Sequence, residues 1–296
     1  MRLLVTGKSG QVVTALVERG TAQGIQILKV GRPEFDLTNP NAGLEAIANA
    51  RPDVIVSAAA YTAVDRAESE VHLAEAINAT GPRAVAGLAA ELGVPIVHLS
   101  TDYVFDGTKA TPYIECDLTN PLGVYGRTKL AGEQAIAAAT LNHAILRTAW
   151  VYSPFGNNFL KTMLRVAAER PAVRVVDDQF GNPTSALDIA DTVLLVARNL
   201  QDQPNDTSLR GIFHMAGTGE ASWADFAEEI FSMSRHIGGP FANVTRITTS
   251  DYGTPAKRPA NSRLDTSKLQ KTHGAVLPAW QTSTRSTLLR LLVGGA

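Results

Sequence analysis

The fold is decided by residues 2–13, which read RLLVTGKSGQVV. A short apolar run, Arg2 to Val5, leads directly into a turn that contains Gly7 and Gly10, and a helix-forming segment follows. Glycines let backbone N–H groups approach a ligand closely, and the N-terminus of a helix carries partial positive charge. This strand, turn and helix predict the first unit of a dinucleotide-binding domain.

The turn matches the dinucleotide-binding pattern only in part. Its spacing is Gly-x-x-Gly, and Val13 stands where the third glycine is usual. An ordinary strand-to-helix turn has a similar sequence, but the position at the start of a βαβ unit favours cofactor binding. The residues that we expect at the cofactor phosphates are Gly7, Lys8, Ser9, Gly10, Gln11 and Val12.

Further apolar runs of strand length alternate with helical segments along the first half of the chain. The runs are Arg2 to Val5, Ile25 to Val30, Val54 to Ser57, Ile96 to Leu99 and Ala144 to Thr148. Alanine- and leucine-rich segments between them predict helices at Gln11 to Arg19, Asn41 to Ala50, Leu73 to Leu92 and Gly126 to Ala139. Strands this apolar are typical of a parallel sheet covered on both faces. We therefore predict a Rossmann-like, doubly wound α/β domain.

The pattern becomes less regular after Tyr152. Loops are expected at Phe155 to Asn158 and Asp177 to Thr184, and the expected helices are Phe159 to Glu169, Ser185 to Asn199 and Trp223 to Ser234, the last with Ser222 as its cap. We predict a dinucleotide-binding domain over 1–152, to which 183–217 adds a strand, Gly211 to Met215, and a helix. Residues 153–182 and 218–296 then form a smaller, discontinuous substrate-binding lobe.

Composition excludes several classes of function. The chain has 296 residues, a net charge of -1 and 45% hydrophobic residues, which is typical of a globular protein and lacks the basic surface that nucleic acid requires. One cysteine, Cys116, permits no internal disulfide, and the six histidines show no metal-binding spacing. The N-terminal apolar run is too short for a secretory signal, and no run is long enough to span a bilayer. We expect a cytoplasmic protein that uses no metal and binds neither membrane nor nucleic acid.

The end of the second strand bears on the choice of cofactor. An acidic residue there would bind the adenosine ribose, but Arg32 occupies this region, and its guanidinium suits the 2′-phosphate of NADPH. This favours NADPH as the cofactor. The use of NADH stays open, because Arg32 could instead be a solvated surface charge. Other residues expected at the cofactor are Asp36 and Leu37 at the adenine, and Ala58, Ala59, Ala60, Tyr61 and Thr62 after the third core strand.

A tyrosine and a lysine lie four residues apart in a predicted helix, Tyr125 and Lys129. Positions i and i+4 share one helix face, so the ammonium is expected near the phenol and would favour the phenolate. With the hydroxyl of Thr101 nearby, Tyr125 becomes a proton donor for a carbonyl group near neutral pH. Many ordinary helices contain the same spacing, and only the surrounding motifs give it weight.

These motifs resemble those of the extended short-chain dehydrogenases/reductases. The glycine turn is followed in order by STDYVFDG at 100–107 and VYGRTKLAGE at 124–133. The resemblance narrows to the dTDP-4-dehydrorhamnose reductase family through AAAYTAVDRAE at 58–68, TAWVY at 148–152, GNNF at 156–159, DQFGNPT at 178–184 and RPANSRLD at 258–265. Together the motifs cover nearly the whole chain.

The resemblance implies NAD(P)H-dependent reduction of the 4-keto group of a nucleotide sugar, dTDP-4-dehydro-L-rhamnose. It assigns catalysis to Thr101, Tyr125 and Lys129, with Tyr125 and Lys129 also contacting the cofactor. The residues expected at the substrate are Thr101, Asp102, Trp150, Asn158, Arg258, Asn261 and Arg263. Whether the protein forms a homodimer stays open.

Several alternatives stay open at this point. Trp150 is equally consistent with the core, Arg258 and Arg263 with the solvated surface, and Asn157, Asn158, Gln179 and Asn182 with turns instead of nucleotide contacts. The same fold also hosts nucleotide-sugar epimerases and dehydratases, and non-catalytic regulatory subunits. An intact Thr101, Tyr125 and Lys129 argues against a non-catalytic role.

Overall fold

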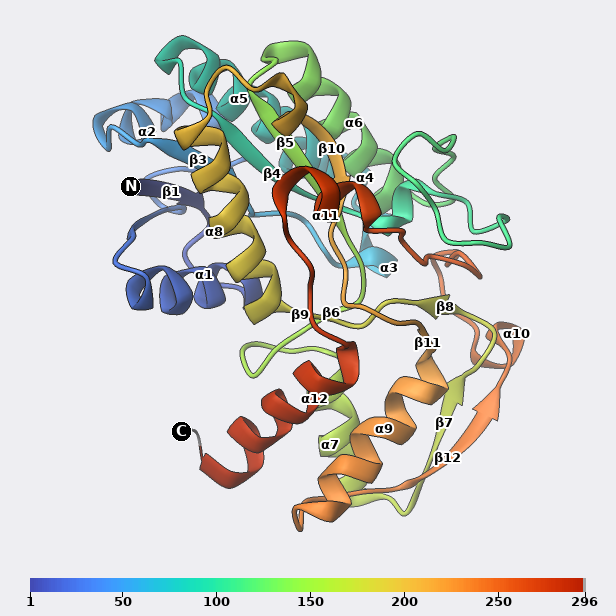
Figure 1. Cartoon of the computed structure of the whole chain (residues 1–296). Helices are drawn as coiled ribbons and strands as arrows, with labels where there is room; N and C mark the ends of the chain where they lie inside the picture. Colours follow the sequence, from blue (N-terminus) through green and yellow to red (C-terminus); the bar gives the residue numbers. More distant parts are fainter. Residues whose placement is uncertain (295–296) are drawn as a thin grey trace.

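The computed structural model describes residues 1–294. Its centre is a six-stranded, fully parallel sheet (Figure 1). The strands are β1 (Arg2–Thr6), β2 (Gln26–Val30), β3 (Val54–Ser57), β4 (Ile96–Thr101), β5 (His143–Thr148) and β10 (Gly211–His214). The five expected strands are all present, and the sixth, β10, pairs with β5. The predicted doubly wound α/β class is confirmed.

The order of the strands locates the ligand-binding edge of the sheet. They run β10-β5-β4-β3-β1-β2, so the chain changes direction of progress between β1 and β3. Doubly wound sheets bind ligands at such a switch point, outside the carboxyl ends of the strands. The glycine turn after β1, Ala58 after β3, Thr101 at the end of β4 and Thr148 at the end of β5 all lie at this edge.

Alternate residues of each strand face two separate hydrophobic cores. On one face Leu3 and Val5 of β1 pack in a core that includes α1 (Gln11–Ala22) and α8 (Ala186–Asp202). On the other face Leu4 packs in a core that includes α2 (Leu44–Asn49), α5 (Gly81–Leu92) and α6 (Val124–Ala139). The period-2 alternation of a strand therefore buries both faces, which explains why most residues of these strands are apolar.

Two predicted helices of the first domain are interrupted in the structure. The segment expected at Asn41 to Ala50 is a 3-10 turn, Pro40–Ala42, followed by α2. The segment expected at Leu73 to Leu92 consists of α4 (Val71–Glu75), a π-helical turn (Ala76–Thr80) and α5. Pro82 has no N–H to donate to the carbonyl of Asn78, four residues earlier, so regular α-helical bonding cannot continue there.

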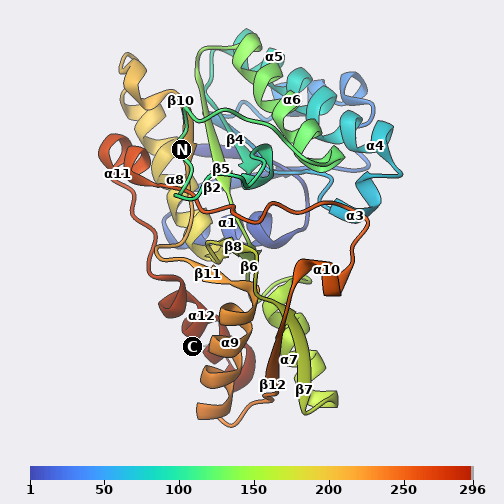
Figure 2. The ribbon, with the colours of Figure 1, turned by 90° about the vertical axis from the view of Figure 1, so that its right-hand side faces the viewer.

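The second lobe has a core of its own and lies below the sheet (Figures 1 and 2). It contains α7 (Phe159–Glu169), α9 (Trp223–His236) and α12 (Trp280–Leu289), packed on the parallel pair β7 (Ala172–Val176) and β12 (Asn243–Ile247). Ser222 caps α9 through a capping box with Asp225, as predicted for the cap. The pair β7 and β12 was not predicted. The boundary between the two lobes stays a proposal.

Short elements connect these layers. They are α3 (Val64–Ala67), β6 (Val151–Tyr152), β8 (Phe180–Gly181), β9 (Thr184–Ser185), β11 (Ala221–Ser222), α10 (Thr249–Tyr252) and α11 (Ser267–His273), with 3-10 turns at Asp102–Val104 and Thr207–Leu209 and a π turn at Arg290–Gly294. The expected loop over 177–184 thus contains β8 and the start of β9, two-residue strands that pair with β11 and β6.

A buried ion pair joins three elements at the ligand-binding edge. Arg147 on β5 and Glu133 on α6 are each 2% exposed, and Arg147 donates to both oxygens of the carboxylate, at 2.9 Å from Nε to Oε1 and 2.7 Å from Nη2 to Oε2. Ser100, near the end of β4, also donates to Glu133. Removing one member of a buried pair leaves an uncompensated charge in the interior.

We therefore expect Glu133→Ala to lower the free energy of unfolding by about 3 to 5 kcal/mol. Urea denaturation followed by circular dichroism measures this change. Glu34→Ala, which removes the exposed partner of Lys8, is the control and should leave the free energy nearly unchanged. Equal effects of the two substitutions would show that Arg147 finds other compensation.

Candidate active site

A cleft of about 700 Å³ runs from the glycine turn, past the ends of the central strands, to the second lobe. Such clefts between a doubly wound sheet and a second lobe are common sites for cofactor and substrate. The predicted residues that line it are Ser9, Gly10, Gln11, Val12, Ala58, Ala59, Ala60, Thr62, Thr101, Asp102, Tyr125, Lys129, Trp150 and Asn158. The same cavity therefore contains the turn predicted for the cofactor and the residues predicted for catalysis.

The glycine turn has the shape that the sequence predicts. Gly7 and Gly10 have φ angles of 106° and 117°, a region that suits glycine and disfavours other residues. A Cβ on Gly7 would lie 3.3 Å from Cγ2 of Val13 and 3.4 Å from Cβ of Ala59. Val13, which replaces the usual third glycine, is thus a core residue that packs against the turn and also borders the cleft.

Thr101, Tyr125 and Lys129 come from two neighbouring elements and meet in the cleft. Thr101 ends β4, while Tyr125 and Lys129 lie on the first two turns of α6. Helix α6 approaches the end of β4 closely because residue 126 is glycine; a Cβ there would collide with the carbonyl oxygen of Tyr103. The ring of Tyr103 packs edge-on against Tyr125 with centroids 5.7 Å apart.

The electrostatics of this group differ from the simple expectation. Desolvation raises the pKa of Tyr125 to about 12, and hydrogen bonding with Thr101 offsets only part of the increase. Desolvation also lowers the pKa of Lys129 to about 8, with Glu133 opposing the change. Lys129 was expected to lower the tyrosine pKa, but burial has the larger effect, because it disfavours the charged form of both groups. The phenol therefore remains protonated at neutral pH.

Asp102 is a buried carboxyl group at the same place. It is 3% exposed, its Oδ1 accepts a hydrogen bond from Thr101 at 2.9 Å, and its Oδ2 has no partner within residues 1–294. Burial raises the pKa of Asp102 to about 7, and the nearby hydroxyls of Ser262 and Thr101 lower it in part. Thr148, beside Thr101 in the sheet register, also has a buried hydroxyl without a partner in this part of the chain. Unpaired polar atoms that line a cleft are suited to ligand hydroxyl groups.

Two tryptophans form the wall of the cleft that faces the second lobe. Trp150 adopts a φ of 44°, which is unusual for a residue other than glycine. Its ring stacks on Trp223 of α9, with centroids 3.6 Å apart and an interplanar angle of 8°. Trp150 was predicted, whereas Trp223 was not. Its only signal in the sequence is its position directly after the helix cap Ser222, which does not reveal a contact 73 residues away along the chain.

A hydrogen-bonded link joins the cofactor turn to the second lobe. Gln11, the first residue of α1, accepts from Asn158 at 2.9 Å and from Ser153 at 2.8 Å. Asn158 also caps α7 by accepting from the backbone N–H of Lys161. Asn158 therefore closes the turn at α7 and lines the cleft at once, so both readings of this residue fit the structure.

The residues predicted at the adenosine lie outside the lining of the cleft. Arg32 is exposed just after β2, and Lys8 of the turn pairs with Glu34. Asp36 accepts two hydrogen bonds from Thr38, which lower its pKa. Leu37 is a core residue that packs against Gly81 of α5, and its contact with the adenine stays a prediction. Gly7 and Tyr61 lie beside the lining; the Tyr61 hydroxyl donates to Glu70.

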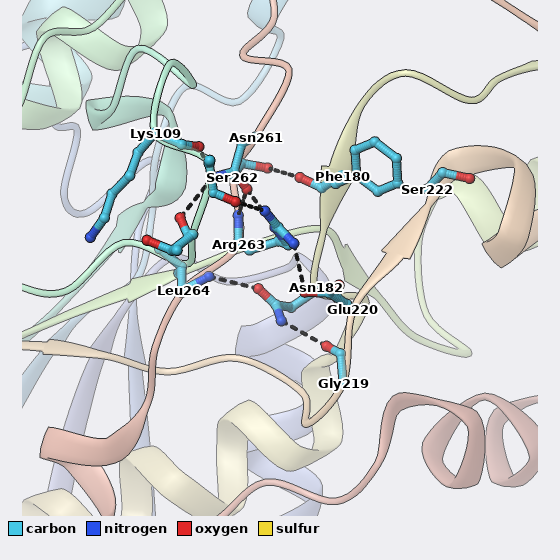
Figure 3. A network of polar contacts seen from close by, with 12 residues as sticks. Lys109, Phe180, Asn182, Gly219, Glu220, Ser222, Asn261, Ser262, Arg263 and Leu264 are labelled. Carbon is cyan, nitrogen blue, oxygen red and sulfur yellow. Dashed lines mark hydrogen bonds and ion pairs between the residues drawn. The ribbon is translucent and has the colours of Figure 1, made fainter.

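Asn261 and Arg263, predicted at the substrate, lie in a network of polar contacts with neighbouring loops (Figure 3), and their role in substrate binding stays a prediction. Asn261 donates to the backbone carbonyls of Lys109 and Thr111, and Arg263 pairs with Glu220 at 2.9 Å. Both side chains therefore hold loops together, and neither lines the cleft.

Asn182 has a similar role, since it bridges Gly219 and Leu264 (Figure 3). Gln179 donates to the hydroxyl of Thr249. Arg258 pairs with Asp65 of α3 at 2.8 Å and lies outside the lining as well. The arginine-rich stretch was predicted to bind the substrate diphosphate, and the sequence contains no sign of the acidic and carbonyl partners that it has in the structure.

Two other predictions concern metals and membranes. Within residues 1–294 no group of three or more metal-ligating side chains comes together. In the same range no helix has the length and hydropathy required to cross a bilayer.

Fold and site together define an oxidoreductase-type dinucleotide-binding protein of the short-chain dehydrogenase/reductase class. Comparison with known proteins is more specific. A family model described as RmlD substrate binding domain matches residues 1–293. The dTDP-4-dehydrorhamnose reductase of Sinorhizobium fredii is 52% identical over 295 residues, covering 100% of this chain and 99% of that protein. That of Escherichia coli K12 is 43% identical, covering 98% of each chain.

A solved structure of similar shape is dTDP-4-dehydrorhamnose reductase from Bacillus anthracis in complex with NADP. It has a TM-score of 0.90 and 34% identity, and the match covers 98% of this chain and 99% of that one. The chain belongs to the dTDP-4-dehydrorhamnose reductase family. The family resemblance drawn from the motifs is confirmed.

The raised pKa of Asp102 makes stability depend on pH. An unfolded aspartate titrates near 3.9, so between about pH 4 and pH 7 the folded protein retains a proton that the unfolded chain has released. Stability from this group is therefore greatest below the unfolded pKa and falls as pH rises, by on the order of a few kcal/mol. Asparagine does not titrate, so in Asp102→Asn this loss of stability at higher pH disappears. Urea denaturation of both proteins at pH 5 and pH 8 should show the variant gaining relative to wild type at pH 8; a constant difference contradicts the assignment.

Proposed function

We propose that this protein reduces the 4-keto group of dTDP-4-dehydro-L-rhamnose with NADPH and forms dTDP-L-rhamnose. The observation that carries the proposal is the single cleft that joins the glycine turn to Thr101, Tyr125 and Lys129. The high identity to dTDP-4-dehydrorhamnose reductases over the full chain supports the same substrate.

The chain has the features that a dinucleotide requires. The turn at 7–10 exposes backbone N–H groups at the N-terminus of α1, which suits a pyrophosphate. Arg32 and Lys29 provide positive charge near the end of β2, where a 2′-phosphate would lie. When bound, NADPH supplies the hydride that the carbonyl carbon accepts. The relative solved with NADP supports this choice of cofactor.

Tyr125 is the proton donor in this proposal. Its hydroxyl is protonated at neutral pH and lies beside Thr101, so the two hydroxyls can bind the same carbonyl oxygen. As negative charge develops on that oxygen, the proton of Tyr125 moves to it and the product is an alcohol. Thr101 donates to the same oxygen and stabilises the charge. Lys129 holds a positive charge next to the phenolate that remains.

The sugar would occupy the space between these hydroxyls and the tryptophan wall. The free Oδ2 of Asp102 and the free hydroxyl of Thr148 offer partners to the sugar hydroxyl groups. Trp150 and Trp223 offer an apolar face to the sugar ring. For the diphosphate, Arg258 is the arginine candidate near the cleft. Its charge opposes the increase in the pKa of Tyr103, which lines the cleft. Binding would then require Arg258 to exchange Asp65 for phosphate.

The experiment that tests the proposal is a coupled assay. dTDP-glucose is converted by the dehydratase and epimerase of the pathway and then offered to this protein with NADPH or NADH. We expect oxidation of NADPH that depends on both upstream enzymes and yields dTDP-L-rhamnose. An epimerase would not consume external NADPH, so the absence of oxidation with active upstream enzymes contradicts the proposal.

Loss of the tyrosine hydroxyl should separate chemistry from binding. We expect Tyr125→Phe to reduce kcat by about a hundredfold or more, because the proton donor is lost, while the Kd for NADPH changes little. Stopped-flow reduction and calorimetric titration measure the two quantities. Tyr103→Phe, which removes a neighbouring hydroxyl and retains the ring, is the matched control and should keep most of the activity. Similar losses in both variants would argue against a special role for Tyr125.

Arg32 should decide the preference between the two nicotinamide cofactors. We expect Arg32→Ala to weaken NADPH about tenfold and NADH hardly at all, because only NADPH carries the 2′-phosphate. Calorimetric titration with each cofactor gives the two Kd values. Arg83→Ala, which removes another exposed arginine on α5, should change neither. An equal change for both cofactors in Arg32→Ala would make this residue a bystander.

A further inference from the structure

A histidine next to the predicted catalytic lysine has no role in the proposed reaction. His98 lies in the middle of β4, is fully buried, and does not line the cleft. Its Nε2 is 3.3 Å from Nζ of Lys129, and its Nδ1 is 3.0 Å from Oγ of Ser57 at the end of β3. Burial and the nearby lysine hold the pKa of His98 well below its usual range, so the ring is neutral.

The neutral ring fixes the direction of both hydrogen bonds. An ammonium group can only donate, so Nε2 accepts from Lys129 and the ring proton lies on Nδ1, which donates to Ser57. Ser57 in turn lies at the end of a strand in the middle of the sheet. His98 therefore connects the side chain of Lys129 to the rigid central sheet.

The hydrogen-bonding capacity of Lys129 makes this contact significant. An ammonium group has three N–H donors. One donates to the backbone carbonyl of Leu99 at 2.6 Å, and another to His98. With both anchors occupied, a single N–H remains to face the cleft that Lys129 lines. The long lysine side chain, which would otherwise have many rotamers, is held in one orientation.

We propose that His98 is a positioning residue that directs the remaining N–H of Lys129 toward the ribose hydroxyls of the bound nicotinamide nucleotide. The inference rests on the proposed function for the role of Lys129. His98 touches neither the cofactor nor the sugar and acts only through the lysine.

The other charged and titratable groups near Lys129 do not replace this contact. Glu133, on the same helix, is held by Arg147 of β5 and by Ser100. Asp102, after β4, is bonded to Thr101, and Tyr125 lies one turn before Lys129 on α6. Within residues 1–294, His98 is the one side chain that accepts a hydrogen bond from the lysine ammonium.

Two substitutions of nearly equal polarity separate the two ends of the imidazole. In His98→Gln the longer amide reaches the position of Nε2 and can accept from Lys129. In His98→Asn the shorter amide reaches only the position of Nδ1 and Ser57. We expect His98→Gln to remain close to wild type, and His98→Asn to lose about tenfold in kcat and several-fold in affinity for NADP, with KM for the sugar nucleotide unchanged.

The control is His214→Gln, which changes another fully buried histidine, in β10, that bonds to the Tyr113 carbonyl and not to the lysine. Its stability loss, measured by urea denaturation, shows how much of any effect comes from disturbing a buried strand. We expect His214→Gln to retain NADP affinity even where its stability falls.

Equal NADP affinity and equal kcat in the Gln and Asn variants of His98 would overturn the proposal. Calorimetric titration with NADP requires no turnover, so it tests His98 even if the assay with dTDP-4-dehydro-L-rhamnose fails. An inactive wild-type enzyme with a clear difference in affinity between the variants would refute the proposed substrate and support the positioning role. If the enzymes are active but the two His98 variants do not differ in NADP affinity, the proposed substrate is supported and the positioning role is refuted.

Discussion

The structure of the site depends on one buried carboxylate, Glu133. It accepts hydrogen bonds from Arg147 on β5 and from Ser100 on β4, and it lies one turn after Lys129 on α6. These three elements carry the hydroxyls and the ammonium that meet in the cleft. Because a charge in the interior must be paired, the strands and the helix cannot shift independently without a large cost in free energy.

Burial also sets the proton chemistry of the cleft. The same removal from water raises the pKa of Tyr125 and of Asp102 and lowers that of Lys129, so each group moves toward its neutral form. A phenol that keeps its proton at neutral pH suits a donor that releases it only when charge develops on a carbonyl oxygen. In the proposed reaction, Lys129 would therefore stabilise the Tyr125 phenolate that forms as the proton leaves.

The sequence predicted the fold and brought the glycine turn, Thr101, Tyr125 and Lys129 to one cleft, but it did not reveal contacts between distant segments. Strands buried on both faces are mostly apolar, so the five strands expected in the first domain are all present. The strands β7 and β12 each contain exposed residues and lie far apart in the chain, so their pairing left no local signal. The donors of Asn261 and Arg263 are visible in the sequence, but the backbone carbonyls to which they bond in the structure are not. Trp223 and His98 depend on distant partners in the same way.

The most direct test of the central claim is a crystal structure with NADP and dTDP-L-rhamnose bound together. The account predicts that the O4 atom of the sugar lies within about 3.2 Å of both the Tyr125 and Thr101 hydroxyls. It also predicts the nicotinamide on the opposite side of the C4 carbon, and the ammonium of Lys129 at the ribose. A sugar whose O4 lies away from Tyr125, or a nicotinamide outside the cleft, would contradict it.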